Sequence, residues 1–298
     1  MPEIDDARDA LLRKPPDAGR PVLLAGPTAS GKSALALALA QAQGRVVVNA
    51  DALQVYEMWQ VLTARPDATD CARAPHLLYG GVGAGQDWSV GHWLRAMRDV
   101  LAAHPNPVIV GGTGLYFRAL TEGLAEIPPT PPRLRAEGDK LLAQSGLDAL
   151  LATLDQDTAS RIDTQNPARV QRAWEVQRAT GQGLAAWQDT TPPPLLPLAQ
   201  TSAFVMLPQP DWSAERIATR FDSMIAQGAL DEARAVLPYW NPRAPWAKAI
   251  GAPELIAHLQ GHMSLPDAVA AATLATRQYA KRQRTWFRAR MSGWARLL

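Results

Sequence analysis

The sequence contains very little cysteine, since Cys71 is the single cysteine among 298 residues. One cysteine excludes a disulfide framework within the chain and a cysteine-based zinc cluster, and it fits a reducing compartment. The first 20 residues lack the basic start and apolar centre of a signal peptide. No apolar run approaches the roughly 20 residues needed to cross a bilayer. These absences predict a soluble, cytoplasmic protein with no membrane partner, and we expect a monomer.

Acidic residues are missing from the C-terminal segment, where none follows Asp267. Seven basic residues lie in that segment, so it carries a charge of +7. Because the whole chain carries +2, residues 1–267 carry −5. Such segregation indicates a polyanionic partner. The remaining composition, 47% hydrophobic and 19% charged, supports a buried core and excludes global disorder.

Short β-branched runs alternate with helical patterns in the first part of the chain. A strand, a glycine-rich loop, an Ala- and Leu-rich helix and a second strand follow one another, which predicts a βαβ unit with a parallel sheet and a right-handed crossover. The predicted strands are 21–26, 45–51, 106–112 and 202–210, and the predicted helices are 33–43, 89–103 and 115–124.

Two proline-rich segments, 127–133 and 191–197, divide the chain. Between them the pattern is mostly helical. We therefore predict an α/β fold with a P-loop NTPase-like parallel-sheet core, a helical insertion domain and C-terminal helices. The predicted divisions are a loose leader at 1–20, a core at 21–125 and 201–298, and an insertion at 126–200.

The segment GPTASGKS matches the P-loop pattern G-x-x-x-x-G-K-[ST] and lies between a predicted strand and a predicted helix. Its backbone N–H groups and the helix N-terminus favour phosphate oxygens. Lys32 adds a positive charge, and the Ser33 hydroxyl is a candidate ligand for Mg²⁺. The predicted phosphate-binding residues are Gly26, Pro27, Thr28, Ala29, Ser30, Gly31, Lys32 and Ser33.

Two further positions follow predicted strands, at the sheet edge where ligands bind in open α/β folds. Asp51 is a candidate metal ligand or general base, although it is equally suited to capping a helix N-terminus. Thr113, in VGGTGLYF (110–117), offers a hydroxyl, and the glycines there let the backbone approach a substrate. The alternative for this segment is a plain strand-to-helix turn.

A basic stripe lies near the C-terminus. Arg277, Lys281, Arg284 and Arg288 are spaced to share one helix face, and aromatic residues interleave with them. Such a surface suits phosphate contacts and base stacking. A solvated surface helix is the alternative.

Taken together, these segments resemble the tRNA dimethylallyltransferases, also called tRNA isopentenyltransferases. GPTASGKS, NADALQVY (49–56), LTARP (62–66), VGGTGLYFRALTEGL (110–124) and ATRQYAKRQRTWFR (275–288) follow the family order and spacing. The resemblance covers residues 20–290. Because no Cys/His finger follows the basic tail, the sequence resembles the bacterial type.

The resemblance implies transfer of a dimethylallyl group from dimethylallyl diphosphate to the exocyclic amine of an adenosine. In the family this adenosine lies 3′ of the anticodon in tRNAs that read codons beginning with U. The P-loop and Mg²⁺ would hold the departing diphosphate. Asp51, Thr113 and Lys32 match the catalytic positions, with Asp51 as general base, and Arg220 and Arg216 match residues that clamp the diphosphate.

The resemblance also implies a grip on the tRNA anticodon arm by the insertion and the basic tail. The residues carried over as tRNA contacts are Asn166, Arg169, Arg172, Arg277, Lys281, Arg282, Gln283, Arg284, Trp286 and Arg288. The sequence departs from the family pattern at Ala52, often serine, and at Ala252-Pro253, where a tyrosine and a basic residue are usual.

Three other readings remain for this sequence: an adenylate isopentenyltransferase acting on free nucleotide, a P-loop kinase, and a P-loop RNA-binding protein without transfer chemistry. The first predicts no RNA-binding insertion and no basic tail.

Overall fold

The computed structural model describes residues 9–297, and these form two compact units. One unit joins residues 9–121 to 196–297, and the other is the continuous segment 122–195. The predicted insertion at 126–200 overlaps the second unit.

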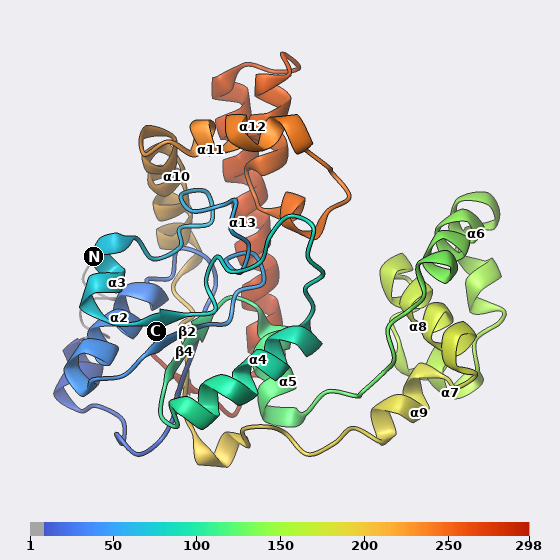
Figure 1. The fold of residues 1–298 in the computed structure, drawn as a ribbon, viewed down its shortest axis with the longest axis horizontal. Helices are drawn as coiled ribbons and strands as arrows, with labels where there is room; N and C mark the ends of the chain where they lie inside the picture. Colours follow the sequence, from blue (N-terminus) through green and yellow to red (C-terminus); the bar gives the residue numbers. More distant parts are fainter. Residues whose placement is uncertain (1–8, 298) are drawn as a thin grey trace. The chain divides into compact units, whose positions relative to one another are not determined.

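The first unit is built on a parallel sheet with the strand order β3-β2-β4-β1-β5-β6. Strands β2 and β4 are labelled in Figure 1. Four of its strands confirm the predicted ones: β1 (Val22–Ala25), β2 (Val47–Asn49), β4 (Val108–Gly111) and β5 (Ser202–Val205). The sequence did not predict β3 (His76–Leu77) and β6 (Ala295–Arg296), which lie at the two edges. The predicted α/β fold with a parallel sheet is therefore confirmed.

The central strands β1 and β4 are buried along their whole length, which explains their continuous apolar sequences. Helix α2 (Lys32–Gln43) packs Leu35 and Leu39 against this sheet. Glycines in the left-handed region flank α2, with φ of 84° at Gly31 and 65° at Gly44.

Two further helices lie before and after β4 in the chain. They are α4 (Val90–Ala103) and α5 (Gly114–Glu122), joined through the stacked rings of Trp93 and Tyr116, whose centroids lie 4.6 Å apart. Trp93 Nε1 donates to the Asn49 carbonyl at 2.7 Å, which fixes α4 to the end of β2. The short helix α3 (Ala68–Arg73) precedes β3.

The C-terminal part of the first unit is helical. It contains α10 (Pro210–Ala226), α11 (Ala229–Val236), α12 (Ala252–Leu259) and the long α13 (Leu265–Arg290). Figure 1 shows α10 beside α13, with α12 near the start of α13. Trp59 and Trp246 lie in the core formed by these helices and the loop after β2. This core holds the first part of α13, through Ala272, against α12.

The prediction of a loose leader at 1–20 needs correction. Residues 1–8 lie outside the described part, but residues 9–20 are held to the core. The buried Arg45 guanidinium donates to the carbonyls of Arg20 and Asp17, at 2.6 and 2.9 Å. Leu11 is buried as well. This segment belongs to the fold because its carbonyls satisfy a buried cation.

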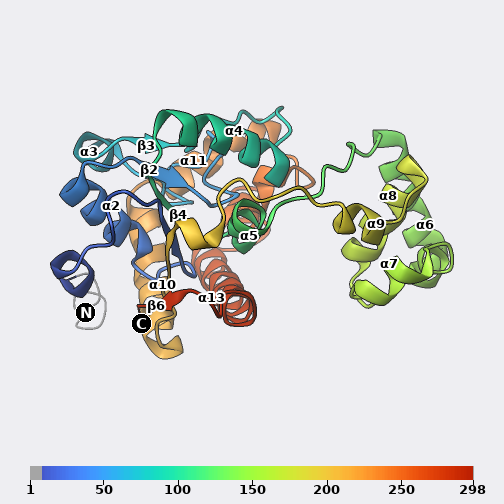
Figure 2. The same ribbon diagram turned by 90° about the horizontal axis from the view of Figure 1, so that it is seen from below.

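The second unit is a helical cluster of α6 (Pro132–Leu151), α7 (Gln156–Arg161), α8 (Pro167–Thr180) and α9 (Leu184–Asp189) (Figure 2). Its apolar core contains Leu150, Val170 and Trp174. Helix α6 is interrupted at Gly146, where φ is 76°.

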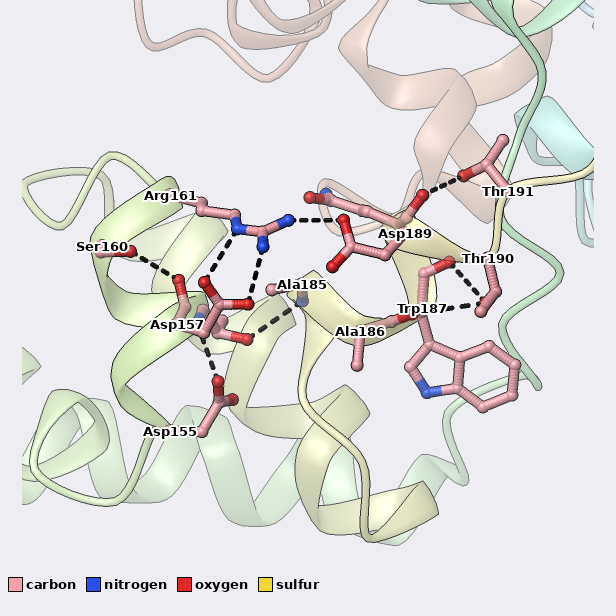
Figure 3. Close-up of polar contacts among 12 residues, drawn as sticks. Asp155, Asp157, Ser160, Arg161, Ala185, Ala186, Trp187, Asp189, Thr190 and Thr191 are labelled. Carbon is pink, nitrogen blue, oxygen red and sulfur yellow. Dashed lines mark hydrogen bonds and ion pairs between the residues drawn. The ribbon is translucent and has the colours of Figure 1, made fainter.

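Polar contacts fasten α7 to α9 within this unit (Figure 3). Arg161 pairs with Asp157 at 2.8 Å and with Asp189 at 2.6 Å. The buried Thr158 hydroxyl accepts from the Ala185 N–H at 3.0 Å. The buried hydroxyl contact orients the two short helices, while the exposed ion pairs add little free energy.

Within residues 9–297, no helix is long and apolar enough to cross a membrane.

Candidate active site

The P-loop between β1 and α2 has the conformation of an anion nest. Ala29 and Gly31 both have positive φ, 61° and 84°, which turns successive N–H groups inward. Within residues 9–297, the backbone N–H groups of Gly31, Lys32 and Ser33 have no hydrogen-bond partner. Thr28 differs, because its N–H donates to the Gln283 side chain at 2.9 Å. Three N–H groups at the helix start are thus available to a phosphate.

Lys32 extends over this nest and is half-buried. Its Nζ donates to the Pro27 carbonyl at 3.2 Å. Burial lowers the pKa of Lys32 to about 8, the Asp51 carboxylate partly opposes the shift, and Arg220 adds to it. A bound diphosphate would add negative charge beside this poorly solvated cation and would favour its protonated form.

Asp51 follows β2 and is fixed by its neighbours. The buried Asn49 side chain accepts from the Asp51 N–H at 2.8 Å and donates to the Asp51 carbonyl at 2.9 Å. The Asp51 carboxylate accepts from the Leu53 N–H at 3.0 Å. It does not cap a helix, since α3 begins only at Ala68. Oδ1 therefore orients the side chain, while Oδ2 lies toward Gly112, 3.2 Å from where a Cβ of that residue would be.

Thr113 lies beside the same turn. Its hydroxyl accepts from the Ala52 N–H at 2.9 Å, and its own N–H donates to the Ala50 carbonyl at 3.1 Å. The structure therefore shows Thr113 positioning the chain around Asp51. The backbone N–H of residue 52 is held whether the side chain there is alanine or serine, so the departure at Ala52 leaves this contact intact.

The glycines around Thr113 allow close packing within the protein, and their approach to a substrate stays a prediction. A Cβ at Gly111 would collide with the Ala50 backbone. A Cβ at Gly112 would collide with the Gln283 amide, and one at Gly114 with the Trp286 ring. These glycines allow close contact between the end of β4, the end of β2 and α13.

A cavity of about 780 Å³, counting its open mouth, lies next to these groups in the first unit. Its polar lining includes Lys32, Ser33, Asp51, Arg220 and Tyr279. Burial and the charge of Asp51 raise the pKa of Tyr279, so its hydroxyl stays protonated at neutral pH. The cavity's apolar lining consists of Leu53, Leu62, Ile217, Phe221, Met224 and Ile250.

The two arginines of α10 differ in their position relative to the cavity. Arg220 lines the cavity, and burial and the charge of Arg216 lower its pKa. Arg216 lies outside the cavity lining; its Nε donates to the Ala29 carbonyl at 3.1 Å and its guanidinium stacks on Trp212. Arg220 is thus placed to contact an anion, whereas Arg216 supports the P-loop.

Most basic residues of α13 are exposed. Arg277, Lys281, Arg282 and Arg288 reach solvent, and Arg284 is half-buried. Arg282 also stacks near the Tyr279 ring, at 5.8 Å from its centroid. Trp286 is half-buried beside Gly114. The predicted basic stripe therefore lies on the solvent-facing surface of α13.

Gln283 is the exception on this helix. It is 6% exposed, and its amide is hydrogen bonded to Thr28 and to Gly112. Its oxygen and its nitrogen each have a partner inside the protein, so its contact with tRNA stays a prediction without support from exposure.

The insertion residues are only partly free. Arg169 is exposed. The Asn166 side chain caps α8 by accepting from the Arg169 N–H at 3.3 Å. Arg172 donates to Thr130 and lies 4.0 Å from Glu175. The oxygen of Asn166 and the guanidinium of Arg172 therefore have structural contacts, and Arg169 is the best placed of the three for a ligand.

Sequence reasoning did not find Asn49 or Glu232, and it gave Gln283 a contact with tRNA in place of its contacts with Thr28 and Gly112. Glu232, on α11, accepts backbone N–H groups from Gln60, Val61 and Leu62 at 2.7–2.9 Å, which shapes the loop that supplies Leu62 to the cavity. The contacts of Glu232 and Gln283 join residues about 170 to 255 positions apart in the sequence. The contact of Asn49 with the Asp51 N–H lies within an ordinary turn. The only local signal was the asparagine two residues before Asp51, a spacing typical of Asx turns.

Comparisons with known proteins agree with this arrangement. Residues 54–290 match the family model "IPP transferase", and residues 20–74 match "Isopentenyl transferase". A tRNA dimethylallyltransferase of Cereibacter sphaeroides is 66% identical, covering 92% of this chain and 88% of its own length. One of Dinoroseobacter shibae is 61% identical, covering 93% and 94%.

Solved structures show the same fold. A full-length tRNA isopentenylpyrophosphate transferase from Bacillus halodurans has a TM-score of 0.64 at 27% identity, covering 93% of this chain and 89% of that one. A eukaryotic dimethylallyltransferase acting on tRNA has a TM-score of 0.76 at 25% identity, covering 90% and 69%. The family match and the identity to tRNA dimethylallyltransferases show that this chain belongs to the IPP transferase family.

Proposed function

We propose that the chain transfers a dimethylallyl group from dimethylallyl diphosphate to the exocyclic amine of an adenosine in tRNA. One observation carries the proposal: a single cavity brings together the cations Lys32 and Arg220, the carboxylate Asp51 and an apolar wall. The cations match a diphosphate, and the wall matches a five-carbon prenyl chain. The family of the chain supports the same activity.

The reaction breaks the allylic C–O bond, and the diphosphate leaves with the electron pair. The N–H groups of Gly31, Lys32 and Ser33, with the Lys32 and Arg220 side chains, stabilise the charge that builds on the leaving group. The adenine nitrogen forms the new C–N bond, and its proton passes to the Asp51 carboxylate. Tyr279, protonated beside the cavity, is available as a hydrogen-bond donor.

The residues present fit Mg²⁺. The Ser33 hydroxyl lines the cavity and has no hydrogen-bond partner within residues 9–297. Mg²⁺ in phosphate sites is held by few protein oxygens, together with substrate phosphates and water. The absence of a cluster of three or more acidic, histidine or cysteine side chains in the described residues is compatible with such a site. When bound, the ion would neutralise part of the leaving-group charge.

The adenosine is proposed to be the one 3′ of the anticodon in tRNAs that read codons beginning with U, as the family resemblance implies. The target base has to leave its stack to reach a cavity within the protein. The exposed cations of α13 supply contacts for the anticodon arm, and Arg169 of the helical unit supplies another. We further propose that the chain works as a monomer in the cytoplasm, where its tRNA substrate is found.

The proposal is tested by incubating the protein with dimethylallyl diphosphate and either tRNA or adenosine monophosphate, and by weighing the products by mass spectrometry. Prenylated tRNA is the expected product. Product on the mononucleotide alone would indicate an adenylate isopentenyltransferase. ATP turnover without prenyl product would indicate a kinase, and tRNA binding with neither would indicate a binding protein.

Replacing the exposed Arg288 with alanine is expected to weaken tRNA binding and to lower the slope of log K against log salt by about 1, since one phosphate contact is lost. Binding is measured by fluorescence anisotropy across a salt series. The control is Arg73→Ala, an exposed arginine on α3 paired with Asp70. An unchanged slope for Arg288→Ala would remove this residue from the tRNA interface.

A further inference from the structure

Gln283 occupies a junction of three parts of the active site. It belongs to α13, yet its side chain points inward and is 6% exposed. Its Oε1 accepts from the Thr28 N–H at 2.9 Å, and its Nε2 donates to the Gly112 carbonyl at 2.9 Å. One side chain thus joins the P-loop to the turn that contains Thr113.

The two joined loops have different roles in the proposed reaction: one binds the leaving group, and the other positions the general base. The P-loop holds the leaving group through Lys32 and the free N–H groups after Thr28. The turn after β4 holds Asp51 in place, because Thr113 accepts from the Ala52 N–H and donates to the Ala50 carbonyl. The pairing of β1 with β4 brings the two loops together, with the Gly26 N–H donating to the Gly111 carbonyl at 3.3 Å, and the Gln283 link adds a side-chain constraint beyond the ends of the strands.

The surrounding backbone is shaped to admit this side chain. Gly112 has no Cβ, and a Cβ there would collide with the Gln283 amide and would lie 3.2 Å from Asp51 Oδ2. Gln283 also contacts Tyr279, one turn earlier on α13, whose side chain lines the cavity. The amide is consequently within reach of both the P-loop and the cavity wall.

We infer that Gln283 is a positioning residue for prenyl transfer, which holds the P-loop and the Asp51 turn at their working separation. The inference rests on the proposed function. It assigns Gln283 no direct contact with tRNA, because its amide is buried and bonded to Thr28 and Gly112. It also gives α13 a role inside the active site in addition to its basic outer surface.

The test is Gln283→Met, a replacement of similar size that removes both hydrogen bonds. We expect kcat to fall roughly 10-fold to 100-fold, because displaced hydrogen bonds and a small misplacement of reacting groups have effects of this size. The Kd for tRNA, measured by anisotropy, is expected to stay within about twofold of the wild-type value. Gln278→Met, an exposed position on the same helix, is the matched control and should keep the wild-type kcat.

A second variant tests the same inference if Gln283→Met does not fold. Gly112→Ala leaves Gln283 in the chain but displaces its amide, so it is expected to lower kcat in the same range while tRNA binding persists. Circular dichroism and thermal melting establish that each variant is folded at the assay temperature.

Several results would overturn the inference. A raised Kd for tRNA with normal kcat at saturating tRNA would make Gln283 an RNA contact. Folded Gln283→Met and Gly112→Ala proteins with normal kcat would show that the link serves stability alone. Failure of the proposed function is a separate result, because wild-type protein would then give no prenylated tRNA.

Discussion

Asp51→Asn is expected to lower turnover of dimethylallyl diphosphate and tRNA by a factor of about 10²–10⁴, the range for loss of a positioned general base. Asparagine keeps an oxygen that can accept from the Leu53 N–H, so the turn after β2 is retained. It removes the carboxylate that takes the proton from the adenine amine. The tRNA affinity is expected to change little, since the basic surface of α13 is untouched.

The assay should be run at pH 7, because the Asp51 charge raises the pKa of Lys32 and its loss would lower that pKa further below about 8. At pH 7 the lysine remains largely protonated in wild-type protein, and a repeat of both assays at pH 6 separates loss of the base from loss of the Lys32 charge in the variant. The control is Asp67→Asn, an exposed side chain that caps α3 by accepting from the Asp70 N–H. Near-normal turnover in Asp51→Asn would exclude this residue as the base.

Lys32→Met is expected to lower turnover by about 10²–10³, the cost of losing one group that stabilises transition-state charge. The same change is expected to stabilise the protein without ligand. Burial lowers the pKa of Lys32 to about 8, so at pH 7 the folded state carries a poorly solvated cation. After allowance for the lost hydrogen bond to Pro27, we expect a gain of roughly 1–2 kcal/mol in the free energy of unfolding at pH 7.

The pH dependence of unfolding checks this explanation. The unfolded chain holds the Lys32 proton up to about pH 10.5, whereas the folded chain releases it near pH 8. The unfolded state therefore binds more protons between these values, and the wild-type free energy of unfolding receives a contribution that rises with pH. Urea unfolding from pH 7 to 9.5 should show a smaller rise in Lys32→Met than in wild type. Lys14→Met, at an exposed position, is the control, and equal pH slopes in all three proteins would contradict the account.

Much of the sheet was predictable because its central strands are local, continuous apolar runs. Runs such as Val22–Ala25 and Val108–Gly111 are buried on both faces, and strands buried in this way consist of apolar residues without alternation. The edge strands β3 and β6 have two residues each, and β6 is exposed, so they carry no comparable pattern. Their pairing depends on neighbours supplied by the rest of the fold.

The site was predictable where chemistry is concentrated in a short motif. Lys32, Ser33, Asp51 and Arg220 do line one cavity, although their roles stay predictions. The spacing of the basic residues along α13 predicted its outer surface, whereas the family resemblance did not reveal that Gln283 points inward. Its partner Thr28 is 255 residues away, and such a contact exists only after the sheet and α13 have packed together.

The sheet order also constrains how the protein is made. Strand β1 lies between β4 and β5, and β5 follows the helical unit in the chain. During synthesis at about 5–20 residues per second, β1 pairs with β4 early but waits for some 90 further residues before β5 can cover its other side. We therefore expect that edge of the P-loop strand to stay unpaired until the helical unit and β5 have been made, and an unpaired strand edge is a site for non-native pairing.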